Sequence, residues 1–330
     1  MELSESPRSG IPQAREVSQP VLDVQNLRYS YRKRQALFGV SFQVHERSIH
    51  GFVGPNGAGK TTTLKILSTL LRPAGGVARV YGLDVVRSYK TVRRRIGFMP
   101  DVFNMYPQMT VFECLDFFGA AYGLPRAQRN KVIADVLALT DMDGRKDDFL
   151  RSLSRGMLQR LSLARVLVHD PSLLLLDEPA SGLDPRGRIE LMEILKELRR
   201  MGKTIFISSH ILTELTDLCD SITIIDRGLT RYTGSMAGLL ARGGDEVRYT
   251  LALEKECPLE ERLRAVAGVV DVQRVDGAAA WVVSFRRDSV STNDVLRAAM
   301  ECGGRVVSFK ENLRHLNEAF MDLTEPGVPT

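Results

Sequence analysis

The feature that most constrains this chain is a glycine-rich run ending in a lysine and threonines: Gly54, Pro55, Asn56, Gly57, Ala58, Gly59, Lys60, Thr61 and Thr62. The apolar stretch 48–54 that leads into it indicates a strand, and residues 62–71 have the apolar spacing of a helix. A loop of the form G-x-x-x-x-G-K-[ST] between a strand and a helix is typical of a phosphate-binding site. We therefore expect an α/β fold that binds a nucleotide.

Each part of this loop has a physical reason. A triphosphate carries several negative charges, so backbone N–H groups must converge on it, and glycines let the backbone come close. The following helix directs its free N–H groups and its dipole at the phosphates. Lys60 is expected to contact the β- and γ-phosphates, and the Thr61 hydroxyl is expected to bind Mg²⁺.

A second pattern supplies acidic groups. The four leucines 173–176 predict a buried strand, and Asp177 and Glu178 follow at its C-terminal end, where α/β sheets bind ligands. We expect Asp177 to hold Mg²⁺ through water and Glu178 to orient and deprotonate the attacking water. The alternative is a strand that ends in two solvated acids, and the phosphate loop upstream argues against it.

The rest of the chain divides by its pattern. Strands alternate with helices up to about residue 240, which predicts a parallel sheet covered on both faces, interrupted by helical residues from about 103 to 167. Within this part the pattern predicts an amphipathic helix over 189–202, a helix over 210–220 and a hairpin that turns at Arg227 and Gly228, and a last helix is predicted over 313–323. Residues 241–245 (ARGGD) indicate a linker, and 246–330 predict a small α+β domain in which strands and helices follow the order of a split βαβ or ferredoxin-like fold. Residues 1–20 are rich in Ser, Pro and Arg and are expected to form a disordered tail.

Composition excludes several classes of protein. No apolar run approaches the ~18–20 residues of a membrane span, and 44% hydrophobic with 26% charged residues fits an ordinary globular chain. The formal charge of +5 permits an anionic partner without requiring one, and we expect no nucleic acid. The four cysteines lack metal-ligand or redox spacing, and no secretory leader is seen, so the reducing cytosol is the expected compartment.

Residues 21–240 resemble the ATP-binding subunit of ABC transporters. The most specific resemblance is the signature segment 153–160 (LSRGMLQR), and residues 181–184 (SGLD) match the D-loop of that family. His210 matches the switch histidine. Tyr31 is the best match to the aromatic residue that stacks on adenine, with Tyr29 as the alternative. The resemblance implies a P-loop NTPase fold with a RecA-like core and antiparallel β and helical subdomains.

The resemblance also implies roles for individual residues. It implies that Glu178, His210 and Lys60 are catalytic, that ATP is hydrolysed, and that Mg²⁺ is a cofactor. The implied ATP contacts are the phosphate loop with Thr62, and Tyr31, Asp101, Ser154, Gly156 and Asp184. The implied metal ligands are Thr61, Asp177 and Asp101. Asp184 is also expected to signal between two ATP sites.

Two departures from the family pattern stand out. Arg155 and Met157 replace a Gly and a Gln of the usual signature. The Arg155 side chain either adds charge to the γ-phosphate contact or points to solvent, and we expect solvent. Asp101 stands where the family commonly has Gln. A carboxylate is shorter by one methylene and cannot donate a hydrogen bond, so contact with Mg²⁺ through water is the alternative to direct ligation by Asp101.

These departures resemble those of the ATPases of type-2 exporters, which move drugs, lipids, polysaccharides or ions. The resemblance implies a separate permease of about six membrane helices, a homodimer of ATPase subunits, and a peripheral position on the cytoplasmic face of the plasma or inner membrane. Phe103, Met105 and Tyr106 either receive the permease's coupling helix or belong to the core of the helical part. Residues 246–330 are expected to be accessory or regulatory.

The alternative function is a soluble ABC ATPase, or a nucleotide-regulated module, in macromolecular assembly. The chain lacks the long coiled coils of chromosome-type members, and it has one phosphate loop and one signature rather than two of each.

Overall fold

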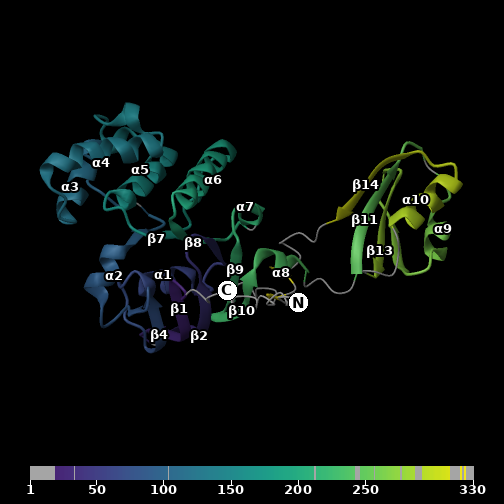
Figure 1. Cartoon of the computed structure of the whole chain (residues 1–330), viewed down its shortest axis with the longest axis horizontal. Coiled ribbons are helices and arrows are strands. Elements are labelled where there is room, and N and C mark those ends of the chain that lie inside the picture. Colours follow the sequence, from purple (N-terminus) through teal and green to yellow (C-terminus); the bar gives the residue numbers. More distant parts are fainter. Residues whose placement is uncertain are drawn as a thin grey trace, which may run out of the picture.

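The computed structural model describes residues 19–32, 34–102, 104–211, 213–241, 246–255, 257–275, 277–286, 292–312, 320–321 and 323–324. Within these ranges the chain forms three sheets with helices around them (Figure 1). The expected disordered tail lies almost wholly outside the described residues, as does Phe103.

The central sheet has six strands in the order β10-β9-β3-β8-β7-β6. All neighbours pair in parallel except β10 with β9. The strands are β3 (Ile49–Val53), β6 (Ile96–Met99), β7 (Leu173–Asp177), β8 (Thr204–Ser209), β9 (Ser221–Asp226) and β10 (Leu229–Ser235). The sequence predicted this parallel sheet, and β9 and β10 form the expected hairpin around Arg227 and Gly228.

Both faces of this sheet are covered, which explains the unbroken run of leucines in β7. Leu173 and Leu175 pack in one core with α1 (Lys60–Leu67), and Leu174 and Leu176 pack in a second core with helices on the other face. Successive strand residues point to opposite faces, so each leucine is buried. The rigid strand that results places Asp177 and Glu178 at its C-terminal end.

The second sheet is antiparallel, in the order β2-β1-β4-β5. Its strands are β1 (Leu22–Tyr31), β2 (Arg34–Val44), β4 (Gly75–Val80) and β5 (Leu83–Asp84), and α2 (Tyr89–Arg95) follows. Leu37 and Phe42 of this sheet share a core with Phe52 of the central sheet and Leu64 of α1. The sheet therefore supports one side of the phosphate loop.

A group of helices lies beyond β7, on the side away from β1, β2 and β4 (Figure 1). It comprises α3 (Val111–Ala121), α4 (Arg126–Leu139) and α5 (Arg155–Leu167), with short 3₁₀ turns η1 (Asp143–Arg145) and η2 (Leu150–Ser152). Thr110 and Glu113 form a capping box that fixes the start of α3. Helix α6 (Pro185–Arg200) follows β7, as its amphipathic pattern predicted.

The helix predicted over 210–220 is much shorter in the structure. Helix α7 spans only Thr213–Thr216. Ser209 holds the chain in a turn, because its Oγ accepts a hydrogen bond from the N–H of Ile211 at 2.9 Å. The Asp220 carboxylate accepts from the N–H of Ile49 at 2.9 Å, which draws the chain back to the sheet. Helix α8 (Met236–Ala241) then packs beside β10.

The third sheet, order β12-β13-β11-β14, is entirely antiparallel. Its elements run β11 (Glu246–Leu253), α9 (Glu260–Ala265), β12 (Val269–Arg274), β13 (Ala280–Arg286), α10 (Thr292–Glu301) and β14 (Val306–Asn312). This βαββαβ order is the ferredoxin-like arrangement that the sequence indicated. Leu263 and Val295 of the two helices pack on the sheet with the chain's single tryptophan, Trp281.

After the third sheet the chain returns to the first part of the structure. Phe320 and Leu323 pack against the same core as α5, α6 and α8. Most of the helix predicted over 313–323 lies outside the described residues. None of the helices within the described ranges combines the length and hydropathy that a membrane crossing requires.

Candidate nucleotide-binding site

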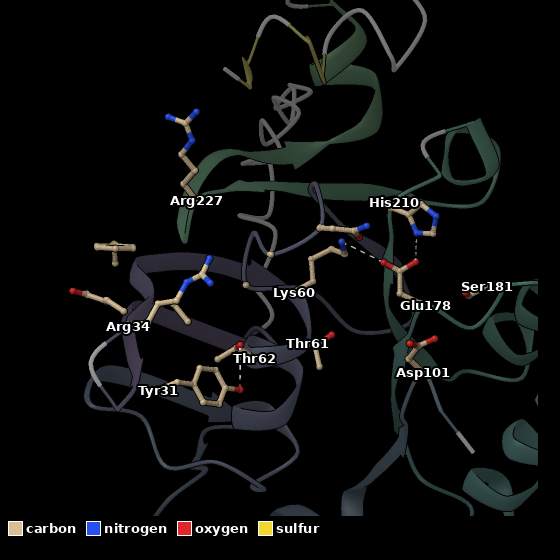
Figure 2. Close-up of a pocket in the computed structure, with 16 residues that line it drawn as sticks. Tyr31, Arg34, Lys60, Thr61, Thr62, Asp101, Glu178, Ser181, His210 and Arg227 are labelled. Carbon is tan, nitrogen blue, oxygen red and sulfur yellow. Dashed lines mark hydrogen bonds and ion pairs between the residues drawn. The ribbon is translucent and has the colours of Figure 1, made fainter. Parts of the chain in front are cut away.

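A pocket of about 710 Å³ opens between the phosphate loop, the end of β7 and the neighbouring strands β1 and β2. Figure 2 shows its lining, in which the phosphate loop lies between an aromatic side and an acidic side. The predicted residues that line it are Tyr31, Asn56, Gly57, Gly59, Lys60, Thr61, Thr62, Asp101, Glu178 and His210. Segments as far apart in the sequence as Tyr31 and His210 thus meet at this pocket.

The phosphate loop (Gly54–Thr61) has a backbone that only glycine accepts easily. Gly57 has φ +80° and Gly59 has φ +110°, in the region that L side chains rarely adopt. A Cβ on Gly59 would also lie 2.5 Å from Cδ2 of Leu37. Helix α1 begins directly after Gly59, and no side chain caps its start within the described residues. Its first N–H groups are therefore available to an anion in the pocket.

Lys60 is buried and lies against the loop that it follows. Its Nζ donates to the carbonyl oxygen of Gly54 at 2.7 Å and to that of Pro55 at 3.3 Å. It also forms an ion pair with Oε1 of Glu178 at 3.3 Å. The cation is thus held where the phosphates of a nucleotide would follow the loop.

Glu178 is the central acidic group of the site. Lys60 and His210 both point toward it (Figure 2), and His210 Nδ1 donates to its Oε2 at 2.5 Å. The backbone of Glu178 has φ +49°, a left-handed turn that is uncommon outside glycine. Its side chain is 14% exposed, whereas that of His210 is 47% exposed. This turn and the two basic partners fix the carboxylate at the pocket wall.

Ser208 at the end of β8 holds both acidic residues. Its Oγ donates to Oδ1 of Asp177 at 2.7 Å and accepts from the N–H of Glu178 at 3.0 Å. The sequence analysis did not assign Ser208. The signal was present, because a buried apolar strand ends in two serines just before His210, and polar residues at the ends of parallel strands converge on a site.

The predicted metal ligands also converge. Asp177 is 1% exposed and is hydrogen-bonded to the Thr61 side chain. Burial raises the pKa of Asp177, and the nearby Glu178 and Asp101 carboxylates raise it further. Carboxylates that repel one another, together with a hydroxyl oxygen beside them, are suited to a hard cation such as Mg²⁺. Asp101 is exposed and lines the same pocket.

The two candidate aromatic residues have different positions. Tyr31 is 44% exposed and lines the pocket, and its hydroxyl lies 3.4 Å from Oγ1 of Thr62. Tyr29 packs against the core and meets the edge of the Tyr31 ring, with the ring centroids 4.8 Å apart. Tyr31 is therefore the residue placed to stack on a base. Arg34, Phe38 and Arg227 also line the pocket and had not been assigned.

The predicted residues of the signature segment and the D-loop do not line this pocket: Ser154, Gly156 and Asp184. Four others lie behind its wall, namely Gly54, Pro55 and Ala58 of the phosphate loop and Asp177 of β7. Ser154 caps α5 by accepting from the N–H of Met157 at 3.3 Å, and Asp184 caps α6 by accepting from the N–H of Gly187 at 2.9 Å. Arg155 is exposed, as expected, yet its guanidinium lies against the loop that carries Gly182.

Comparison with known proteins decides the family. Residues 37–181 match the family model described as ABC transporter. An uncharacterized ABC transporter ATP-binding protein of Nostoc is 33% identical over 88% of this chain and 84% of its own length. The chain belongs to the ABC transporter family. Family members of this kind carry an ATPase domain. The Nostoc alignment is longer than residues 21–240, so it includes part of the third sheet.

Other ABC relatives match over a shorter part of the chain. The Nod factor export ATP-binding protein I of Ralstonia nicotianae is 39% identical over 64% of this chain and 66% of its own length. The linearmycin resistance ATP-binding protein of Bacillus subtilis is 35% identical over 69% and 73%. This ABC chain thus spans just under two thirds of the first of these relatives.

Solved structures agree on the ABC fold. The structure of an ATP-binding subunit of an ABC transporter has a TM-score of 0.62 at 29% identity, and covers 68% of this chain and 93% of that one. CbiO1 of Clostridium perfringens, part of the ABC transporter complex cbiONQ, has a TM-score of 0.61 at 27% identity and covers 68% and 91%.

Proposed function

We propose that this chain is the ATP-hydrolysing subunit of an exporter, acting as a dimer of cassettes beneath a separate membrane permease on its cytoplasmic face. The observation that carries the ATPase role is Glu178, held between Lys60 and His210 at the wall of the phosphate-loop pocket. The exporter role is supported by the relatives named for Nod factor export and for linearmycin resistance.

The residues suggest how hydrolysis proceeds. The phosphates of ATP lie along the loop and the start of α1, and they compete with Glu178 for the ammonium group of Lys60. Glu178 is then free to accept a proton from the attacking water, while His210 keeps the carboxylate in place. We propose that Thr61 and Asp177 would hold Mg²⁺, with Asp101 contributing through a bound water, and that the ion would neutralise charge on the phosphates.

The dimer is proposed because the signature segment (153–160) does not line the pocket of its own chain. Ser154 and Gly156 stand at the start of α5, where free helical N–H groups attract an anion. Two chains that face one another place each signature over the partner's phosphate loop. This arrangement is symmetric and closes on itself.

The permease contact is proposed for an exposed apolar surface beside Asp101. Val102 and Tyr106 are 60% and 75% exposed, and Phe149 is 45% exposed. The segments carrying Tyr106 and Phe149 are adjacent, because the N–H of Leu150 donates to the carbonyl of Met109 at 2.9 Å. Met105 packs against the core instead. A surface that adjoins the pocket wall is placed to report nucleotide state to a partner.

The test combines hydrolysis with partner capture. Full-length protein should hydrolyse ATP, and Glu178→Gln should lower kcat by about 10²- to 10⁴-fold. The same variant with ATP, used as bait on detergent-solubilised native membranes, should retain a stoichiometric multi-span protein. Adding Tyr106→Ser should weaken the capture, whereas Tyr89→Ser, an exposed tyrosine on α2, should not. Capture of soluble partners alone would refute the exporter role, and absence of ATP turnover would refute the ATPase role.

A further inference from the structure

The Arg155 side chain joins two loops that are distant in the sequence. A Cβ placed on Gly182 would lie 2.1 Å from Cζ and 2.3 Å from Nε of Arg155. The guanidinium therefore lies on the bare backbone of Gly182, and its Nη2 is 3.5 Å from Oγ of Ser181. Gly182 also has φ +72°, so both its conformation and this contact require glycine.

Two neighbouring contacts reinforce the junction. A Cβ on Gly156 would lie 3.5 Å from Cδ2 of Leu183, so the backbone at the start of α5 packs on the same loop. One turn further along α5, Arg160 forms an ion pair with Glu190 of α6. The start of α5 thus meets loop 178–184 at two points, and α5 is held to α6, which follows that loop, at a third.

The two sides of this junction face different sites. Loop 178–184 begins with Glu178 and includes Ser181, and both line the nucleotide pocket of their own chain (Figure 2). The start of α5 carries Ser154 and Gly156, which do not line that pocket. In the proposed dimer these residues meet the nucleotide of the partner.

We infer that Arg155 is a positioning residue that couples the two ATP sites of the dimer. It fastens the signature segment, which completes the partner's site, to loop 178–184, which forms a wall of its own site. Movement of Glu178 on ATP binding or hydrolysis then shifts the signature segment. The inference rests on the proposed dimeric ATPase and assigns a role to the residue that replaces a glycine of the usual signature.

The chemistry of arginine distinguishes this role from a simple charge effect. A planar guanidinium lies flat on a peptide unit and offers several donors in fixed directions, whereas a lysine ammonium is a mobile point charge. If Arg155 only attracted phosphate, Lys would replace it. If it positions the loop through the contact of its guanidinium with Gly182 and Ser181, Lys would not.

The experiment uses the full-length chain and compares Arg155→Ala, Arg155→Lys and a matched control, Arg151→Ala. Arg151 is an exposed arginine near the signature whose guanidinium lies over Phe149 instead of loop 178–184. ATPase rates are measured against ATP concentration to give kcat and a Hill coefficient. Binding of a fluorescent ADP analogue measures the affinity of the single pocket.

The parent and Arg151→Ala should show a Hill coefficient above 1 and no greater than about 2, the limit for two sites. Arg155→Ala and Arg155→Lys should both lower it to about 1 and reduce kcat roughly 2- to 30-fold, the range of coupling effects. ADP affinity should stay within about twofold, since Arg155 does not line the pocket.

Three results would overturn the inference while leaving the ATPase role intact: a Hill coefficient that Arg155→Ala does not change, full rescue by Arg155→Lys, or a parent enzyme that hydrolyses ATP with a Hill coefficient of 1. Loss of ADP binding in Arg155→Ala would also overturn it, because it would make Arg155 a direct ligand. Absence of ATP turnover in the parent would instead refute the proposed function itself.

Discussion

His50 should make the stability of the cassette depend on pH in a predictable direction. It lies in the middle of the central sheet, 1% exposed, stacked on Phe42 and Phe206. Its ring nitrogens are hydrogen-bonded to the hydroxyls of Ser221 at 2.8 Å and Thr223 at 2.9 Å. Burial, helped slightly by the charge of His45, lowers the pKa of His50 from 6.5 to about 3.

The direction of this pH dependence follows from the number of protons that each state binds. In the unfolded chain His50 takes up a proton as the pH falls below 6.5, but in the folded chain it does so only near pH 3. The unfolded state therefore binds more protons in this window, and folding stability falls as the pH falls. pH 5 lies about 1.5 units below the pKa of His50 in the unfolded chain, whereas His50 in the folded chain is still neutral there. The free energy of unfolding is therefore about 2 kcal/mol lower at pH 5 than at pH 7.

The matched variant is His50→Gln, which keeps a donor and an acceptor but does not titrate. Its own packing cost is constant with pH, so the informative quantity is the parent-minus-variant difference in unfolding free energy at pH 5 and at pH 7. That difference should change by about 2 kcal/mol, with the parent losing more at pH 5. Other shifted groups, such as His169 and Asp177, are common to both proteins and cancel.

The unfolding of the cassette should be followed by calorimetry or far-UV circular dichroism. Tryptophan fluorescence would report on the third sheet instead, because the single tryptophan, Trp281, belongs to its core. For a unit of this size the change amounts to roughly 4–8 °C in Tm. The fluorescence transition of Trp281 should not differ between parent and variant. A difference between the two proteins that stays constant from pH 5 to pH 7 would refute the description of His50 as a buried neutral base.

Three further predictions test the site and the fold. Tyr31→Ala should weaken the binding of ATP and of ADP by about 1–3 kcal/mol, the value of stacking on a base, and Tyr31→Trp should restore that binding. Titration with each nucleotide measures the affinities, and equal affinity in the parent and both variants would contradict the prediction. Ser208→Ala should leave the N–H of Glu178 unpaired, which should destabilise the fold by about 1–3 kcal/mol and lower kcat. Denaturation and ATPase assays measure the two effects, and unchanged turnover would show that Ser208 does not position the carboxylates. Thr110→Ala should break the capping box at α3 and cost about 1 kcal/mol in thermal unfolding without changing nucleotide affinity, and Thr110→Ser should be close to the parent.

The sequence was most informative where one short segment carries its own constraint. The alternation of strands and helices predicted the parallel sheet, and the leucine run of β7 predicted a buried strand with two carboxylates at its C-terminal end, because burial on two faces leaves few alternatives. The short strands β4, β5 and β6 and helix α2 were not predicted. They owe their form to neighbours in the sheets rather than to a pattern of their own.

Contacts between distant segments could not be predicted from the pattern. Ser208 reaches Asp177 from the adjacent strand, and Arg155 rests on Gly182 through a loop that the sequence places 27 residues away. The length of α7 was also missed, since the apolar spacing of 210–220 is helical while the Ser209 turn prevents a helix from starting at residue 210. In each case a hydrogen bond or contact of one side chain, which the apolar pattern does not encode, decides the outcome.

Phe320 and Leu323, which follow the small domain in the sequence, pack against the core of the cassette. The ferredoxin-like unit is an insertion held at both of its ends, rather than an appendage on a single tether. Two anchorages confine its orientations more than one would, so its position can be shifted by a pull on either connection. Ending the chain near residue 241 would therefore remove the unit and also uncover apolar surface on the cassette. A variant in which a short flexible linker replaces residues 246–312 would remove the unit and keep Phe320 and Leu323 on the cassette, so it is the better test of what the unit does.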